Sequence, residues 1–154
     1  MKVQEYERNY RLESNYWYFV GLRAIVWTLI DFSIGKGRLG RVLDLGCGTG
    51  ALLDELRPRS DELWGVDISR EAIEFCQQRG HKNLVLTSAT TLPFENAYFD
   101  LVTAIGVIEH IENDKEFIAE MRRVLKPGGT AILMTSSFPF LWSMHDVANE
   151  HVRR

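Results

Sequence analysis

Short apolar runs alternate along this chain with longer segments in which apolar positions recur every three or four residues. The runs that predict strands are residues 41–45, 62–68, 83–87, 99–107 and 130–135. The segments with helical periodicity lie between them, at residues 51–57, 69–80 and 113–125. Strands that alternate with helices indicate parallel pairing with right-handed crossovers. The pattern therefore predicts an α/β fold, a doubly wound and mostly parallel sheet.

Residues at the ends of the predicted helices support this division. Ser69 is suited to cap the start of a helix and Gly80 to close it. The sequence KPGG at residues 126–129 is expected to end the next helix before the last strand. The near-continuous apolar run FDLVTAIGV is typical of a strand covered on both faces.

The N-terminal region is expected to lie outside this alternation. Residues 1–13 are polar and predict a helical lead-in, followed by a helix from Ser14 to about Phe32. Charged residues interrupt its aromatic stretch, at Arg23 and Asp31, so we expect a helix that covers the domain and no membrane span. Residues 1–36 are therefore assigned to a helical lid, and residues 37–154 to the core.

Composition narrows the class of protein. A chain of 154 residues with 45% hydrophobic and 25% charged residues predicts one globular domain at most. A net charge of −3 argues against a protein that mainly neutralises nucleic-acid phosphates. Cys47 and Cys76 form no CxxC pair, and no leader is evident, so we expect reduced thiols in a cytoplasmic protein. The four histidines show no ligand spacing, and no metal site is predicted.

The segment VLDLGCGTG, residues 42–50, carries the strongest local signal. A strand ends, glycines allow a sharp turn close to a ligand, and a helix begins with its free N–H groups facing that ligand. Gly46, Gly48 and Ala51 also fit the dinucleotide-binding fingerprint, with Asp67 where its ribose-binding acid belongs. The loop alone thus leaves a nicotinamide-dependent oxidoreductase open.

Asp44 favours a different ligand. It stands two residues before the first glycine, where a carboxylate would repel a pyrophosphate. S-adenosylmethionine (SAM) has no phosphate and carries a sulfonium and an ammonium, both of which an acid attracts. Asp67, at the end of the second strand, can accept hydrogen bonds from both ribose hydroxyls. Either acid could instead serve as a cap or turn residue.

Five ordered motifs then resemble a known family. VLDLGCGTG, GVDIS, the LPF of SATTLPF, FDLVTAIGVIEHI and VLKPGG are similar to successive motifs of class I SAM-dependent methyltransferases, nearest to the small-molecule "type 11/type 12" group. The resemblance covers residues 40 to 137 and implies SAM as cofactor. The segments YWYFVGLR and FPFLWSMHDVANEHVRR resemble members of this group with weaker specificity.

The resemblance implies roles at matching positions. The methionine moiety would be bound by Asp44 and the glycine loop, the ribose by Asp67, and the adenine by Ile68, Ser88 and Ala89. The family usually has an aspartate where Ser88 stands, and a neutral hydroxyl weakens that contact. The full predicted cofactor site comprises Asp44, Gly46, Cys47, Gly48, Gly50, Asp67, Ile68, Ser88, Ala89, Ile105 and, from the lid, Arg23 meeting the methionine carboxylate.

Methyl transfer needs a nucleophile held in line with the methyl group in a dry cleft, and a base only when the acceptor is protonated. His110 and His145 are the predicted catalytic residues, with Glu109 and Asp146 as further candidate bases. Structural roles remain open for each. The acceptor is expected to be a small molecule and no nucleic acid.

Class I methyltransferase sheets ordinarily end in an antiparallel hairpin, for which 19 residues after Thr135 leave no room. We therefore expect an incomplete C-terminus or a partner, such as a second copy of the chain, that covers an open sheet edge. A catalytically silent SAM-binding module is the first alternative to an enzyme, and an NAD(P)-dependent oxidoreductase the second.

Overall fold

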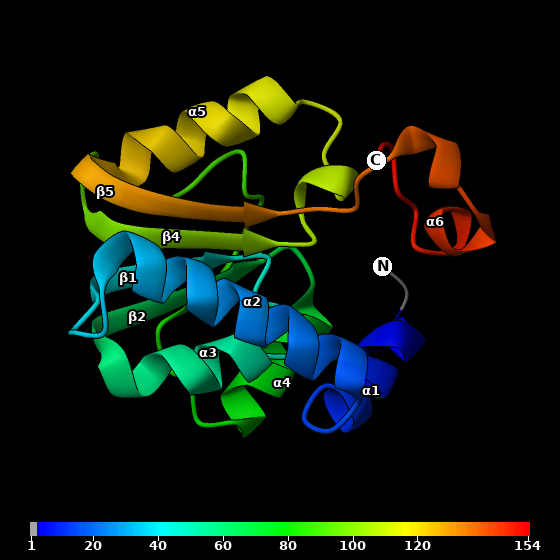
Figure 1. Ribbon diagram of the computed structural model, residues 1–154, viewed down its shortest axis with the longest axis horizontal. Coiled ribbons are helices and arrows are strands. Elements are labelled where there is room, and N and C mark those ends of the chain that lie inside the picture. The colour runs from blue at the N-terminus through cyan, green and yellow to red at the C-terminus, as the bar shows by residue number, and fades with distance from the viewer. Residues whose placement is uncertain (1–2) are drawn as a thin grey trace.

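The computed structural model describes residues 3–154, except for the side chains of residues 3, 4 and 145. Five parallel strands form one sheet in the order β3-β2-β1-β4-β5 (Figure 1). The strands are β1 (Gly40–Leu45), β2 (Ser60–Asp67), β3 (Leu84–Leu86), β4 (Phe99–Ile105) and β5 (Leu125–Met134). The predicted doubly wound α/β fold is confirmed.

The described part of the chain also contains six α-helices and three short 3-10 turns, which precede, connect and follow the strands. The α-helices are α1 (Val3–Leu12), α2 (Trp17–Ile34), α3 (Ala51–Leu56), α4 (Arg70–Gln78), α5 (Asp114–Val124) and α6 (Met144–Ala148). The 3-10 turns are η1 (Arg57–Arg59), η2 (Ile108–His110) and η3 (Pro139–Leu141). Ser69 caps α4 as predicted, because its side chain accepts a hydrogen bond from Ala72 N.

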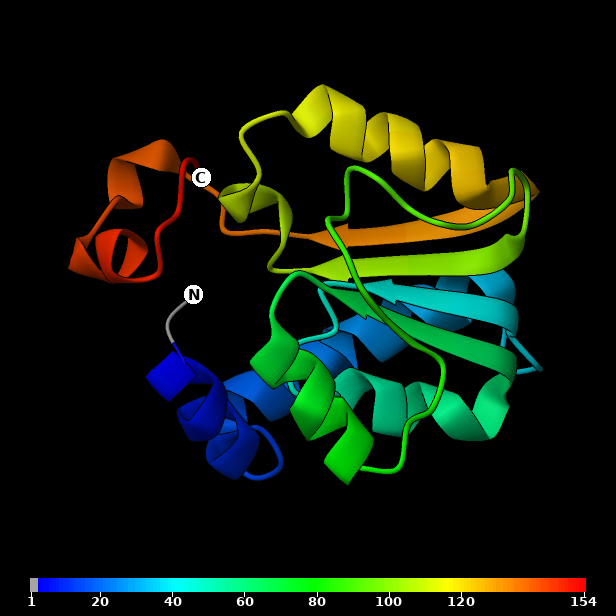
Figure 2. The ribbon, with the colours of Figure 1, turned by 180° about the vertical axis from the view of Figure 1, so that it is seen from behind.

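Helices cover both faces of the sheet. The helices α2, α3 and α4 lie on one face and α5 on the other (Figures 1 and 2). The period of two along β1 explains this division, because Val42 packs toward α2 and α3 whereas Leu43 and Leu45 pack toward α5. Phe117 and Met121 of α5 are buried against the same cluster.

Some boundaries differ from those predicted. The fifth strand begins at Leu125, five residues before the predicted start, and includes the KPGG segment. Phe99 pairs with Leu125 and Leu101 with Thr130, so residues 126–129 bulge out of the ladder. The glycines and proline therefore interrupt the pairing while the chain stays extended. Residues 108–110, which follow the fourth predicted strand, form the turn η2.

Helix α2 is the most apolar helix of the described chain. By length and composition it satisfies the criteria for a membrane span, with 18 residues, a mean hydropathy of 1.3 and 11% of these residues buried. Val26 and Ile30 are fully buried against the sheet, which fits the predicted covering helix. Phe32 is 89% exposed on its outer side.

The carboxyl ends of all five strands point to one side of the molecule. Both terminal segments, α1 and the α6 region, lie beyond this side (Figures 1 and 2). The strand order changes direction between β1 and β4, and ligands of open α/β sheets bind outside the strand ends at such a switch point. The fold thus places a candidate site between the sheet and the two terminal segments.

Candidate functional site

A cavity of about 810 Å³ lies at the carboxyl ends of β1, β2 and β4. This volume is within the range of sites that bury a drug-sized ligand. Its walls contain every residue of the predicted cofactor site except Gly50, together with His110. Residues 40 positions apart or more in the sequence therefore come together as the motif order predicts.

The glycine loop after β1 turns by means of left-handed backbone conformations. Gly46 has φ +68° and Gly48 has φ +53°, while Gly50 begins α3 with φ +90°. The N–H groups of Gly46 and Cys47 both donate to Val66 O, at 2.7 and 3.0 Å. These bonds hold the loop against β2, so its remaining backbone faces the cavity.

Gly46 is also required by close packing. A Cβ at this position would lie 2.4 Å from Val107 Cγ2, whereas a Cβ at Gly48 would meet no atom within 4 Å. We expect Gly46→Ala to lower the free energy of unfolding by about 3 kcal/mol, because strain and overlap add, and Gly48→Ala by about 1 kcal/mol. Urea denaturation of both variants checks this difference. Equal losses would show that the contact with Val107 has no energetic weight.

The two buried cysteines pack behind this loop. The Cys47 and Cys76 sulfurs lie 3.8 Å apart, and Cys76 Sγ donates to Gly48 O at 3.3 Å. The hydrogen bond with Cys76 and burial raise the pKa of the Cys47 thiol. A thiol with a raised pKa is a poor nucleophile. Cys47 therefore contributes to the cavity wall by packing and not by reacting.

Asp44 is buried at the floor of the cavity, with 3% of its surface exposed. Thr103 lies directly opposite on β4, and its hydroxyl donates to Asp44 Oδ1 at 2.6 Å. Burial raises the pKa of Asp44 to about 7, and Thr103 opposes part of this rise. A carboxyl group whose pKa is close to 7 is only partly ionised at neutral pH, and it ionises fully when a cation lies beside it.

Thr103 supports the site from behind Asp44, although it does not line the cavity itself, and the sequence did not single it out. It was read only as part of an apolar strand, yet it is the one hydroxyl within β4. The sequence did contain a signal for Thr103, because a polar side chain inside a strand that is covered on both faces needs a buried hydrogen-bond partner. The register of β1 and β4 makes Asp44 that partner.

Asp67, at the end of β2, is 6% exposed and shaped by the loops around it. Its two oxygens accept hydrogen bonds from Gly48 N and Ser69 N, both at 2.9 Å. Burial raises the pKa of Asp67, while these backbone N–H groups lower it. The carboxylate is thus fixed between two chain segments with its remaining lone pairs available to a ligand.

The predicted adenine side is lined by the segment that follows β3. Ile68 is 75% exposed, so its side chain is available to pack against a flat ring. Ser88 Oγ lies 2.8 Å from Thr90 Oγ1 and accepts from Thr90 N at 3.2 Å. Ala89 and Thr90 also line the cavity, and Thr90 was not predicted.

The other wall follows β4. Ile105 and Gly106 line the cavity, and His110 comes next from η2. Glu109, a candidate base, is buried away from the cavity lining, and its carboxylate accepts from Thr135 Oγ1 at 2.9 Å. Asp146, another candidate base, is fully buried and accepts from Arg154. The side chain of His145 lies outside the described part of the structure.

The N-terminal segment closes the cavity opposite the sheet. Tyr10 of α1 stacks on Phe75 of α4 with ring centroids 4.6 Å apart, and Arg79 lies over the Tyr10 ring. Tyr6 lines the cavity, and burial raises the pKa of its hydroxyl to about 12. Tyr18 and Phe19 of α2 complete this wall.

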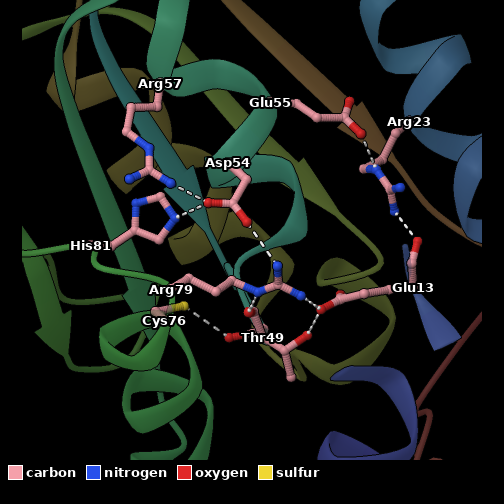
Figure 3. A network of polar contacts seen from close by, with 10 residues as sticks. Glu13, Arg23, Thr49, Asp54, Glu55, Arg57, Cys76, Arg79 and His81 are labelled. Carbon is pink, nitrogen blue, oxygen red and sulfur yellow. Dashed lines mark hydrogen bonds and ion pairs between the residues drawn. The ribbon is translucent and has the colours of Figure 1, made fainter. Parts of the chain in front are cut away.

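A polar network centred on Glu13 fixes this segment to the core (Figure 3). The Glu13 carboxylate accepts from Arg79 at 2.6 Å and from the Thr49 hydroxyl of the glycine loop. Arg79 also donates to Thr49 O and to Asp54, which links α4 to α3. The network was not predicted, since nothing in the spacing of Glu13 and Arg79 indicates contact.

Breaking this network is expected to destabilise the fold. The side chains of Glu13 and Arg79 are 10% and 15% exposed, so loss of one charge leaves the other poorly solvated. We expect Glu13→Gln to lower the free energy of unfolding by about 2 kcal/mol. The control is Glu5→Gln, which removes the exposed pair with Arg8 and should cost under about 0.5 kcal/mol. Urea denaturation compares the two variants. Equal losses of stability would contradict the stabilising role of the Glu13 network.

Arg23 lines the cavity, but strong partners engage its guanidinium. Arg23 Nε lies 2.5 Å from Glu55 Oε1, and Arg23 Nη1 donates to Glu13 O at 2.8 Å (Figure 3). Trp27 donates to the other oxygen of Glu55. The contact of Arg23 with a methionine carboxylate stays a prediction.

Comparisons with known proteins agree with this geometry. A family model described as "Methyltransferase domain" matches residues 43–133. The ubiquinone/menaquinone biosynthesis C-methyltransferase UbiE of Geotalea daltonii is 32% identical over 110 residues, which cover 65% of this chain and 47% of that protein. The ubiquinone biosynthesis O-methyltransferase of Idiomarina loihiensis is 28% identical over 73% of this chain and 49% of its own length.

A solved structure adds to the similarity in fold. The N-methyltransferase NodS of Bradyrhizobium japonicum WM9, crystallised with S-adenosyl-L-homocysteine (SAH), has a TM-score of 0.69 at 23% identity, covering 84% of this chain and 70% of that one. At this identity the likeness concerns the fold alone. The chain spans about half the length of most curated relatives that it matches.

Proposed function

The chain belongs to the methyltransferase domain family, the class I enzymes whose cofactor is SAM, and from this premise we propose that it transfers a methyl group from SAM to a small molecule. The accepting atom is an oxygen, nitrogen or carbon nucleophile. Membership of this family removes the nicotinamide-dependent oxidoreductase from consideration. Three related proteins carry C-, O- and N-methyltransferase names, so the family does not fix the accepting atom.

The single observation that carries the proposal is the pair of buried carboxyl groups in the cavity. Asp44 and Asp67 lie 3% and 6% exposed at the ends of neighbouring strands. Within the described residues the side-chain partner of Asp44 is the neutral Thr103, with no cation beside it, and burial raises the pKa of Asp44 to about 7. A ligand with cationic groups at one end and a ribose at the other fits both acids, whereas a pyrophosphate would face repulsion at Asp44.

The residues of this chain would then divide the work of binding. Asp67 would hold the ribose hydroxyls, and Ile68 with Ala89 would enclose the adenine. Asp44 and the glycine loop would hold the amino-acid end, and Ile105 with Gly106 would lie beside the sulfur. SAM supplies an activated methyl group on a sulfonium when it is bound.

His110 is the proposed general base, which takes the proton from the molecule that receives the methyl group. It is the one predicted catalytic side chain that the described structure places in the cavity wall. Burial lowers the pKa of His110, so the ring is neutral at pH 7 and has a lone pair to offer. His145 keeps its predicted role only as a proposal.

Residues 1–36 are proposed to act as a lid, held closed by the Glu13 network. Cavity size favours a small-molecule acceptor, and a net charge of −3 disfavours a nucleic acid. A cytoplasmic location and a second copy that covers the outer edge of β5 also stay predictions.

Two measurements test the proposal. Incubation with methyl-labelled SAM and a panel of phenols, amines and activated carbon acids should yield a labelled product. Calorimetry with SAH should show binding at micromolar concentration, and NAD should give none. SAH binding with no labelled product from any acceptor would favour the silent SAM-binding module. No SAH binding would overturn the proposal.

A further inference from the structure

The segment that follows β5 folds back on the cavity wall at His110. Val152 N donates to Glu109 O at 2.8 Å, and Arg153 donates to Glu112 O at 2.6 Å and to the Asp114 carboxylate. Residues 108–114 and 150–153 therefore lie side by side, although about 40 residues separate them in the sequence. This contact brings the segment HDVANEHVRR to the site.

Asp146 is the centre of this segment. Its carboxylate accepts hydrogen bonds from Ser143 N at 2.7 Å, from Arg154 Nε and Nη2 at 2.6 and 2.7 Å, and lies 3.0 Å from His151 Nδ1. The backbone adds His151 N donating to Asp146 O at 2.9 Å. A fully buried carboxylate with so many donors fixes the loop of residues 143–154 in one conformation.

The loop delivers two groups to His110. The rings of His110 and His151 meet edge to face, with centroids 4.7 Å apart. The backbone of Glu150 also lies beside His110 and favours the protonated form of its ring, which raises the pKa of His110. Glu150 has φ +59°, a left-handed conformation that a non-glycine residue adopts only when its surroundings impose it.

We propose that Asp146 is a positioning residue, which holds His151 and the turn at Glu150 against His110 and thereby fixes His110 as the proton acceptor of the methyl-transfer reaction. Asp146 touches neither the acceptor nor the cofactor. Its effect passes through His151 and the turn at Glu150, in the manner of an orienting group behind a base.

The fate of the proton determines which methyl acceptors need His110 as a base. The acceptor atom loses its proton to the His110 lone pair as it gains the methyl group, and the electron pair of the broken carbon–sulfur bond stays on sulfur. His110 therefore serves a neutral acceptor with a dissociable proton, a hydroxyl or an activated C–H group. This inference rests on the proposed function.

The position of His110 can be measured without knowing the acceptor. Burial lowers the pKa of His110 most, and His151 lowers it further, whereas Glu109 and, with the smallest effect, the Glu150 backbone raise it. If Asp146 holds the loop in place, Asp146→Asn should expose the His110 ring to water. An NMR titration of the His110 Cε1–H resonance should then show its pKa rising by about half a unit toward 6.5.

A matched control separates this effect from loosening of the chain in general. Asp114→Asn breaks the half-exposed ion pair with Arg153 on the same segment but leaves the Asp146 contacts in place. It should leave the His110 pKa unchanged. His151→Gln should raise the His110 pKa as Asp146→Asn does, because the neighbouring ring is gone. An Asp146→Asn variant whose His110 titrates as in the unaltered protein would overturn the inference.

Calorimetry with SAH distinguishes this failure from that of the proposed function. Asp146 lies outside the cavity lining, so Asp146→Asn should bind SAH within twofold of the unaltered protein. If SAH fails to bind the unaltered protein, the proposed function is wrong whatever His110 does. If SAH binds and the His110 titration is unmoved, only the positioning role is wrong.

Discussion

Asp67→Asn is expected to weaken SAH binding about 100-fold while the protein stays folded. The substitution removes the charge that strengthens the proposed hydrogen bonds from both ribose hydroxyls. In the unaltered protein Gly48 N and Ser69 N each donate to a different oxygen of Asp67. An asparagine side chain has only one oxygen, so one of these two N–H groups loses its acceptor. Calorimetry with SAH measures the loss, and a thermal unfolding scan shows whether the fold survives.

The control for Asp67 is Glu74→Gln. Glu74 is exposed on α4, the helix that follows Asp67, and does not line the cavity. Its replacement removes one negative charge nearby and should change SAH affinity less than twofold. Similar losses in both variants would mean that net charge, and no specific contact at Asp67, governs binding.

Asp44→Asn is expected to stabilise the protein without ligand at pH 8 and to weaken its affinity for SAM at least tenfold. The pKa of Asp44 is about 7 in the folded protein and about 3.8 when unfolded. The folded state therefore binds more protons between these values, and the stability of the unaltered protein falls as pH rises from about 4 to about 7.

The size of this effect follows from the shift. At pH 8 the ionised carboxylate opposes folding by an amount that the substitution removes, and we expect a gain of about 2–4 kcal/mol in the free energy of unfolding. At pH 4 the gain should be close to zero, because Asp44 is protonated in the folded state. Urea denaturation at both pH values measures it. The exposed Asp61→Asn serves as control, since Asp61 pairs with Arg38 at the surface.

A gain in stability with a loss of binding is typical of a group retained for function. If Asp44→Asn instead destabilised the protein at pH 8, the buried carboxylate would be a structural element. Its bond from Thr103 would then outweigh the cost of burial.

The sequence predicted the five strands because apolar periodicity and turn chemistry determine strands locally, and it predicted their parallel pairing because helices alternate with them. Each predicted strand exists, and the glycines at 46, 48 and 50 all have positive φ, which the turn after β1 requires. The KPGG segment was misjudged in extent, because glycine and proline stop regular pairing without ending the strand. The likeness in motifs also placed Asp44 and Asp67 in one cavity.

The contacts that sequence could not predict are those made across long separations. Glu13 and Arg79 lie 66 positions apart, and no periodicity links them. Thr103 was hidden in an apolar run until the register set it opposite Asp44. Asp146 had been read as a candidate base, and only its burial with Arg154 and His151 shows that its lone pairs are already used.

The binding of SAH at pH 7, measured calorimetrically in two buffers of different ionisation enthalpy, tests the central claim most directly. The claim is that a nucleoside with an ammonium group occupies the cavity, its ammonium near Asp44 and its ribose at Asp67. We expect one molecule of SAH to bind per chain with release of about half a proton, because a ligand ammonium forces Asp44 to ionise. The release should vanish in Asp44→Asn. No binding of SAH, or equally tight binding of NAD, would contradict the claim.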